Sequence, residues 1–352
     1  MSFTVAVGGA TWGVGTELLG ALERRNFPIG KLVPLGPQAS AGHSIVFRSD
    51  SVEVRDIAKY NFEGTDLLFL CANSEISKII APIATAAGCV VIDNSSAFRM
   101  DLDVPLIVPE VNFAALDNWA IRRILPVASC LTIQLVVALK PLHDVAGLKR
   151  VVVSTYQAPD GAGRRMLRRL MSPADPVGLD LRGLLSDAKH TLKKGGEKPI
   201  AFNVVPHVGD FLSDGCTQEE RNIEVESRKI LGLPDLPVAV TCANVSALVG
   251  HAEAVTVEFE RPIEAAHAHR ILACSPGVRV LDEPRLGGYA TLLDVEGTDT
   301  VWVSRIRRDA SVPYGLHLWI VTDNFRKGAT LNAVEIAEAL VARDFQRQLR
   351  SD

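Results

Sequence analysis

Residues 5–19 read VAVGGATWGVGTELL, and this stretch decides the class of fold. An apolar run over residues 5–7 leads into a glycine-rich turn, and an amphipathic helical pattern follows Gly15. This is the layout of a dinucleotide-binding loop, in which the start of a helix meets a pyrophosphate. Trp12 stands where a GxxGxxG spacing from Gly9 to Gly15 places its middle glycine, the one that admits the phosphates closely.

The sequence leaves the conformation of Trp12 open. The indole either points away from the phosphates, fills the cofactor groove, or packs on the surface. Because Gly13 follows at once, the loop can stay tight in the first case. The candidate cofactor contacts in this loop are Gly9, Thr11, Trp12, Gly13, Val14 and Gly15.

The first 125 or so residues alternate short strand-like runs with helical patterns. Strand-like runs lie at 5–7, 66–72, 89–93 and 106–111, and helical patterns follow Gly15 and Ser77. This alternation predicts a parallel sheet covered by helices on both faces. We therefore expect an α/β chain with a nucleotide-binding domain over residues 1–128, completed by a C-terminal helix at 329–352.

The pattern changes after Ser129. A helix is predicted at 132–147, followed by long strand-like runs at 149–158, 238–250, 251–262 and 299–309. Runs of this length and spacing favour a mixed or largely antiparallel sheet. We expect this sheet to form a second, α+β domain over residues 129–328.

Composition excludes several classes of protein. The 352 residues are 47% hydrophobic and 22% charged, which is ample for a core, and the net charge of −4 gives no general affinity for nucleic acid or membranes. No apolar run approaches the roughly 20 residues of a membrane helix, and no basic region precedes the first apolar run. Six scattered cysteines without a CxxC pair favour neither a metal site nor a disulfide framework. We expect a cytoplasmic protein without metal.

Three residues form a candidate catalytic set. Cys130 begins a predicted helix, where the helix dipole and unpaired N–H groups lower a thiol pKa. Gln157 ends a strand, and His251 precedes one. A thiolate, a carbonyl-orienting amide and a proton partner would suit nucleophilic catalysis. From spacing alone, Cys130 fits equally well as a small buried residue at a helix cap.

Several long stretches resemble the aspartate-β-semialdehyde dehydrogenase family, nearly from end to end. They are VIDNSSAFRMDLDVPLIVPEVN (91–112), CLTIQLVVALKPLH (130–143), VVVSTYQAPDGAG (151–163), FNVVPHVGDFLSDGCTQEE (202–220), GHAEAVTVEFERP (250–262) and VTDNFRKGATLNAVEIAE (321–338). The resemblance implies a dimeric or tetrameric cytosolic enzyme with a Rossmann domain and a catalytic, dimer-forming domain. Enzymes of this family reduce L-aspartyl 4-phosphate with NADPH, or catalyse the reverse reaction.

The same resemblance implies roles for individual residues. Cys130 would carry a thioester, His251 would act as acid and base, and Gln157 would position the acyl group. The implied substrate contacts are Arg99 for phosphate, together with Glu219, Asn244, Asn222 and Ser129. Further implied cofactor contacts are Ser40, Ala72, Gly161 and Asn324.

This chain departs from the family at its ligand contacts. Asn244 replaces an arginine that grips the substrate carboxylate, Asn222 replaces a lysine, and Ser129 replaces an asparagine. A charge-assisted pair of that kind is worth roughly 1.5–3 kcal/mol. Ala39 and His43 replace the two cations around the NADP 2′-phosphate, so the choice between NADP and NAD stays open.

The leading hypothesis is an oxidoreductase that forms a Cys130 thioester with a small acyl or aldehyde substrate. That substrate would lack the carboxylate that Asn244 cannot bind. If another cation replaces the arginine in space, the aspartate reaction itself is retained. The alternative is a non-catalytic or repurposed paralogue, acting as a binding or scaffold dimer with an impaired cofactor site.

Overall fold

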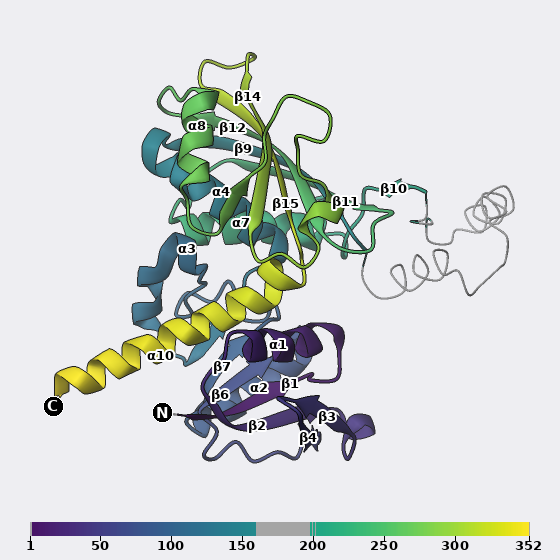
Figure 1. Cartoon of the computed structure of the whole chain (residues 1–352), viewed down its shortest axis with the longest axis vertical. Coiled ribbons are helices and arrows are strands. Elements are labelled where there is room, and N and C mark those ends of the chain that lie inside the picture. Colours follow the sequence, from purple (N-terminus) through teal and green to yellow (C-terminus); the bar gives the residue numbers. More distant parts are fainter. Residues whose placement is uncertain (1, 160–197, 199, 201, 352) are drawn as a thin grey trace, which may run out of the picture.

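The computed structural model describes residues 2–159, 198, 200 and 202–351, with side chains to residue 343. A six-stranded parallel sheet has the order β5-β2-β1-β6-β7-β8 (Figure 1). Its strands are β1 (Phe3–Gly8), β2 (Ile29–Gly36), β5 (Arg55–Asp56), β6 (Leu67–Leu70), β7 (Val90–Asp93) and β8 (Ile124–Pro126). The accompanying elements are α1 (Gly13–Arg24), η1 (Gln38–Ser40), the hairpin β3 (Ser44–Phe47) and β4 (Asp50–Glu53), α2 (Ser74–Ala86), α3 (Pro109–Asn112) and η2 (Phe113–Asn118).

The predicted strand at 106–111 is wrong. These residues form a buried irregular segment that runs into α3, and the outer strand of the sheet is β8. Side-chain amides replace a strand partner here: Asn112 accepts from the backbone N–H of Val108 at 2.9 Å and donates to the carbonyl of Leu106 at 2.9 Å. Asn332 donates to the carbonyl of Ile107 at 3.2 Å. The segment is apolar because it is buried, and its backbone is satisfied without a sheet.

A seven-stranded mixed sheet has the order β10-β11-β9-β12-β15-β14-β13. Its strands are β9 (Leu148–Gln157), β10 (Val204–Val205), β11 (Val238–Val245), β12 (His251–Phe259), β13 (Val278–Val280), β14 (Val301–Asp309) and β15 (Gly315–Thr322). The pairs β11–β9 and β13–β14 are parallel, and the others are antiparallel. The structure therefore confirms an α/β chain with a Rossmann-type parallel sheet and a second, mixed sheet.

Helix α4 (Cys130–Ala146) is the central helix of the second sheet. Most of its side chains are buried, and it packs against β12, β15, α7 (Gln218–Leu231) and α8 (Ala265–Ala273). The short helix α9 (Leu292–Val295) lies beside β15.

The last helices cross the region between the two sheets (Figure 1). A π-helix, η3 (Arg326–Leu331), contacts α1 and α4, and α10 (Asn332–Ser351) contacts β7, α1 and α3. Buried Lys327 pairs with Glu110 and, at 2.9 Å, with Glu335. The C-terminal segment thus connects the two sheets through a charge cluster centred on buried Lys327. Within the described residues, no helix is long and apolar enough to span a membrane.

Candidate active site

Three candidate residues lie side by side across adjacent strands of the second sheet. Asn244 of β11 pairs in register with Gln157 of β9, and Gln157 pairs with His251 of β12. Residues paired in register on neighbouring strands point to the same face of a sheet. The three side chains therefore form a row where β9 and β11 end and β12 begins.

Helix α4 places Cys130 beside this row. Cys130 is the first residue of the helix, and its Sγ lies 3.3 Å from Nδ1 of His251. The thiol is therefore at the positive end of a helix dipole, which favours the thiolate. Burial lowers the pKa of His251 to about 4, so the imidazole is neutral near pH 7 and can accept a proton.

Two residues hold this pair in place. A β-carbon at position 328 would lie 2.5 Å from the Cβ of Cys130, so Gly328 allows η3 to pack directly against the thiol residue. Asn324 accepts from the backbone N–H of Gly250 at 2.9 Å, and Gly250 has a φ of +88°. Asn324 therefore fixes the turn immediately before His251. Sequence reasoning missed Gly328, although it lies in the quoted stretch that contains Asn324.

A carboxylate that sequence reasoning missed organises the start of α4. Glu226 is almost completely buried, and it accepts from the backbone N–H of Ser129 at 2.8 Å and from Arg99 at 2.9 Å. Arg99 also donates to the carbonyl of Asn94 at 3.1 Å, so this candidate phosphate ligand is held by the protein itself. Glu219 accepts from the Ser129 hydroxyl at 3.1 Å. Glu226 lies seven residues after Glu219, which is two helical turns along the same face. This spacing could have indicated from the sequence that Glu226 also faces the site.

The two asparagines that replace family cations make other contacts. Asn222 accepts from Gln218 at 2.8 Å, and Asn244 donates to the carbonyl of His207 at 3.2 Å. Asn222 shares the helix face of Glu219, whereas Asn244 shares the sheet face of Gln157. Gln157 itself donates to the Thr155 hydroxyl at 2.9 Å.

The glycine-rich loop has the geometry of a phosphate loop at its two outer glycines. Gly9 has a φ of +80°, and a β-carbon there would lie 2.2 Å from the carbonyl oxygen of Cys71. A β-carbon on Gly15 would lie 2.2 Å from the carbonyl oxygen of Gly9. Only glycine fits at either position.

The centre of this loop is open. Trp12 is the N-cap of α1 and is 67% exposed, so its indole is not packed into the protein. Thr11 and Gly13 are also exposed, and Val14 is half-buried. Apart from its chain neighbours and the backbone of α1 itself, no described atom lies within 4 Å of where a β-carbon on Gly13 would stand. The start of α1 is therefore accessible to a ligand.

Two further candidate cofactor residues, Ser40 and Ala72, lie just after the strands of the first sheet that neighbour β1. Ser40 ends η1 just after β2, and Ala72 follows β6. Both flank the loop after β1, at the edge of the sheet where nucleotides bind in folds of this kind. Gly161 lies outside the described residues. Among the residues that the structure describes, no group of three potential metal ligands occurs.

The parallel sheet and the loop after β1 define a dinucleotide-binding fold, and the second sheet carries a candidate cysteine nucleophile. Residues 4–119 match the family described as semialdehyde dehydrogenase, NAD binding domain, and residues 139–327 match semialdehyde dehydrogenase, dimerisation domain. The chain belongs to the semialdehyde dehydrogenase family.

Individual relatives cover almost the whole chain. It is 41% identical over 346 residues to the aspartate-semialdehyde dehydrogenase of Legionella pneumophila, covering 98% of this chain and 97% of the relative. It is 42% identical over 344 residues to that of Aquifex aeolicus (strain VF5), covering 97% and 98%. The crystal structure of aspartate semialdehyde dehydrogenase II from Vibrio cholerae matches with a TM-score of 0.86 and 37% identity, over 97% of this chain and 99% of that one. The expected family and its nicotinamide-cofactor class are confirmed.

Proposed function

We propose that this protein interconverts an activated acyl group and an aldehyde through a thioester on Cys130. The observation that carries the proposal is the 3.3 Å contact between Cys130 Sγ and His251 Nδ1 at the start of α4. A helix start stabilises a thiolate, and a neutral imidazole at that distance can take the thiol proton.

The residues around the thiol suit acyl transfer. The Cys130 thiolate attacks the acyl carbon, a carbon–sulfur bond forms, and the activating group leaves. Gln157 lies next to His251 in register, so its amide can orient the carbonyl oxygen where negative charge develops. Once hydride has reduced the thioester carbon and the carbon–sulfur bond has broken to release the aldehyde, His251 returns its proton to the sulfur, which restores the thiol.

The first sheet fits a nicotinamide dinucleotide. The accessible start of α1 at Gly13 offers backbone N–H groups to a pyrophosphate, and Gly9 and Gly15 keep the loop tight. When bound, the cofactor supplies the hydride that reduces the thioester. Because Ala39 and His43 stand where the family has arginine and lysine, we propose that discrimination for NADP over NAD is weak. In this proposal residues 1–128, completed by the C-terminal helix at 329–352, form the cofactor-binding domain, and residues 129–328 form the catalytic and dimerisation domain.

We propose that the substrate is an amino aldehyde, or its acyl phosphate, without a free carboxylate beside the amine. The relatives are named for aspartate semialdehyde. Here Asn244 offers an amide where the family offers a cation, and Arg99 is already paired with buried Glu226. Glu219 keeps a carboxylate that can receive an amino group.

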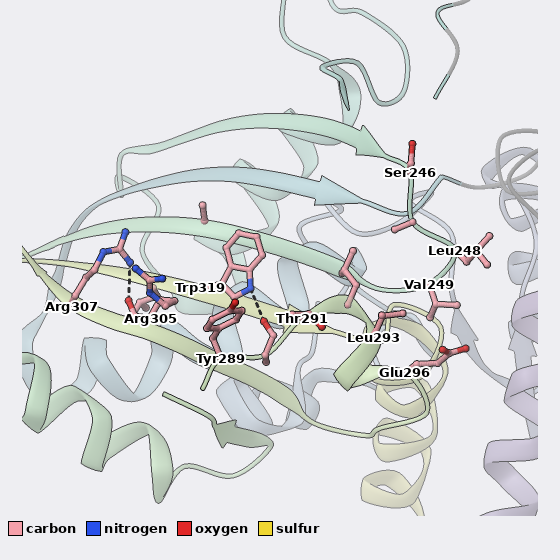
Figure 2. Close-up of a pocket in the computed structure, with 15 residues that line it drawn as sticks. Ser246, Leu248, Val249, Tyr289, Thr291, Leu293, Glu296, Arg305, Arg307 and Trp319 are labelled. Carbon is pink, nitrogen blue, oxygen red and sulfur yellow. Dashed lines mark hydrogen bonds between the residues drawn. The ribbon is translucent and has the colours of Figure 1, made fainter. Parts of the chain in front are cut away.

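We propose a homodimer built through the face of the second sheet opposite α4. A pocket of about 880 Å³ lies on that face (Figure 2). Trp319 and Tyr289 occupy its middle, Arg305 and Arg307 one end, and Val249 the other. A large apolar surface with polar ends is typical of an interface between protein copies. The match to a dimerisation domain supports this arrangement.

The test compares two aldehydes that differ by one carboxylate. Aspartate β-semialdehyde and 3-aminopropanal are each supplied with phosphate and with NAD or NADP, and nucleotide reduction is followed. We expect 3-aminopropanal to give a kcat/KM at least roughly tenfold higher. Higher activity with aspartate semialdehyde would overturn the substrate proposal but not the reaction.

A second experiment tests the reaction itself. Cys130→Ser should abolish activity with both aldehydes, whereas the control Cys274→Ser, at an exposed cysteine, should not. Activity that survives Cys130→Ser would overturn the reaction itself.

A further inference from the structure

A buried polar cluster lies directly behind Cys130 and His251. Glu253 follows His251 by two residues in β12, so both side chains point to the face covered by α4. Gln134 follows Cys130 by four residues in α4, so it lies one turn further along the same helix face. Glu253 and Gln134 are both completely buried.

Five polar atoms of this cluster lack partners. Within the described part of the chain, no hydrogen bond of good geometry reaches either carboxyl oxygen of Glu253, either amide atom of Gln134, or Nε2 of His251, although the Gln134 amide lies near the Glu253 carboxyl and a backbone group of Ala158 lies near the imidazole. Buried polar atoms in native proteins are almost always satisfied, and internal water is the usual partner when protein atoms are not. A shared internal water therefore fits between these three side chains.

Burial disfavours the charged form of the Glu253 carboxyl. Burial raises its pKa well above the ordinary value, and the neighbouring Gln134 amide opposes this only in part. No cation is paired with it among the described residues. The neighbouring strands β9 and β15 contribute uncharged Thr155 and Thr322, which face Glu253 and His251 respectively. Cys242 on β11, whose pKa is raised to about 12, lies near Glu253 and near Glu219 and Glu220 of α7. Cys130 on α4 faces His251, and Lys327 on η3 pairs with Glu110 and Glu335.

We propose that Glu253 is a positioning residue for His251, acting with Gln134 through an internal water that accepts the Nε2–H of the imidazole. This inference rests on the proposed role of Cys130 as the nucleophile. A neutral imidazole carries one proton, and placing it on Nε2 leaves Nδ1 open toward the thiol. When the S–H bond of Cys130 breaks, that proton forms an N–H bond at Nδ1. The Nε2–H bond is kept and its acceptor stabilises the imidazolium, so no proton leaves Glu253.

The test is the pH dependence of Cys130 alkylation. The purified full-length protein is treated with iodoacetamide, and modification of the Cys130 peptide is measured by mass spectrometry. In Glu253→Leu the internal water loses the carboxyl that holds it, and the Nε2–H loses its acceptor with the water, so we expect the midpoint of alkylation to rise by about one pH unit, with roughly tenfold slower alkylation at neutral pH. Glu253→Gln keeps an acceptor oxygen and should retain the wild-type midpoint.

Two further variants keep the test decisive. Gln134→Leu should shift the midpoint in the same direction by a smaller amount, and it decides the matter if Glu253→Leu does not fold. Glu258→Gln is the matched control in β12, because Glu258 pairs with Lys149 away from the thiol, and it should change nothing.

Several results would overturn the proposal. An unchanged midpoint in the folded Leu variants would give Glu253 a purely structural role. An equal shift in Glu253→Gln and Glu253→Leu would mean that a charged carboxylate is needed. If His251→Asn leaves the wild-type profile of Cys130 unchanged, the proposed function fails together with the inference. Because His251→Asn leaves Glu253 in place, this result can be distinguished from a failure of the role proposed for Glu253 alone.

Discussion

Gly328 and Cys130 pack so closely that a β-carbon at position 328 would lie 2.5 Å from the Cβ of the cysteine. The π-helix η3 therefore sets the position of the thiol. Gly328→Ala must push Cys130 away from His251, and a displacement of this kind can lower turnover roughly hundredfold. The measurement is kcat for phosphate-dependent aldehyde oxidation.

Gly20→Ala is the matched control for this substitution. A β-carbon at position 20 of α1 meets only the flexible end of Arg24, at 3.1 Å, so activity should be unchanged. Wild-type turnover in Gly328→Ala would show that the packing of η3 does not position the thiol.

His251 makes stability depend on pH. Its native pKa is about 4, below the ordinary 6.5, so between these values the unfolded chain binds a proton that the native protein does not. This contribution to stability is therefore complete above about pH 6.5 and is lost as the pH falls, to a total of about 3 kcal/mol by pH 4.

The measurement is urea unfolding of wild type and His251→Asn between pH 4 and 7.5. The difference between their free energies of unfolding should shrink with falling pH. A difference that is constant with pH would contradict a buried, neutral His251.

The buried pairing of Lys327 with Glu110 and Glu335 predicts a large stability effect. Lys327→Met leaves two half-buried carboxylates without their cation, which should cost about 3 kcal/mol in the free energy of unfolding, the lower end of the range for breaking a buried pair. Adding Glu335→Gln removes one stranded charge and should restore part of the loss. Thermal and urea unfolding measure both, and a double variant no more stable than the single one would contradict this account.

Replacing Trp12 with the glycine that the loop spacing calls for should change cofactor affinity. The indole is mostly exposed, so Trp12→Gly should change stability little. A glycine there lets the backbone approach the pyrophosphate, and one additional charge-assisted hydrogen bond should tighten NADH and NADPH binding roughly tenfold. Isothermal titration calorimetry measures both dissociation constants. Weaker binding by Trp12→Gly would mean that the indole itself contacts the cofactor.

Restoring the family arginine at position 244 should change which substrate is preferred. Asn244→Arg places a cation in the row with Gln157 and His251, where it can pair with a substrate carboxylate. We expect kcat/KM for aspartate semialdehyde to rise by roughly one to two decades, and that for 3-aminopropanal to fall. Asn222→Lys tests the second lost cation in the same way. An unchanged ratio of the two substrates in both variants would contradict the proposed basis of specificity.

Local patterns in the sequence predicted the main elements around the site. The strand-like runs at 149–158 and 251–262 correspond to β9 and β12, and the helix predicted at 132–147 corresponds to α4. These segments have strong periodicity because one or both of their faces are buried. The strand predicted at 106–111 failed because burial alone produces an apolar run, and the side chain of Asn112 satisfies its backbone instead.

The contacts that hold the site in place could not be predicted from the sequence, because they join residues that lie far apart in the chain. Glu226 reaches Ser129 across 97 positions of sequence, and Gly328 meets Cys130 only after η3 has folded back over α4. The partnerless atoms of Glu253 and Gln134 likewise follow from the packing of α4 on β12. Spacing within one element reveals a shared face, but not which element covers it.

The most direct test of the central claim is to trap the acyl group on the protein. The protein is mixed with 3-aminopropanal and oxidised cofactor without phosphate, quenched in acid, and digested for mass spectrometry. We expect one acyl adduct, on the peptide that contains Cys130, and none in Cys130→Ser. If a substrate that is turned over leaves no adduct there, or leaves one on another residue, the thioester mechanism is contradicted.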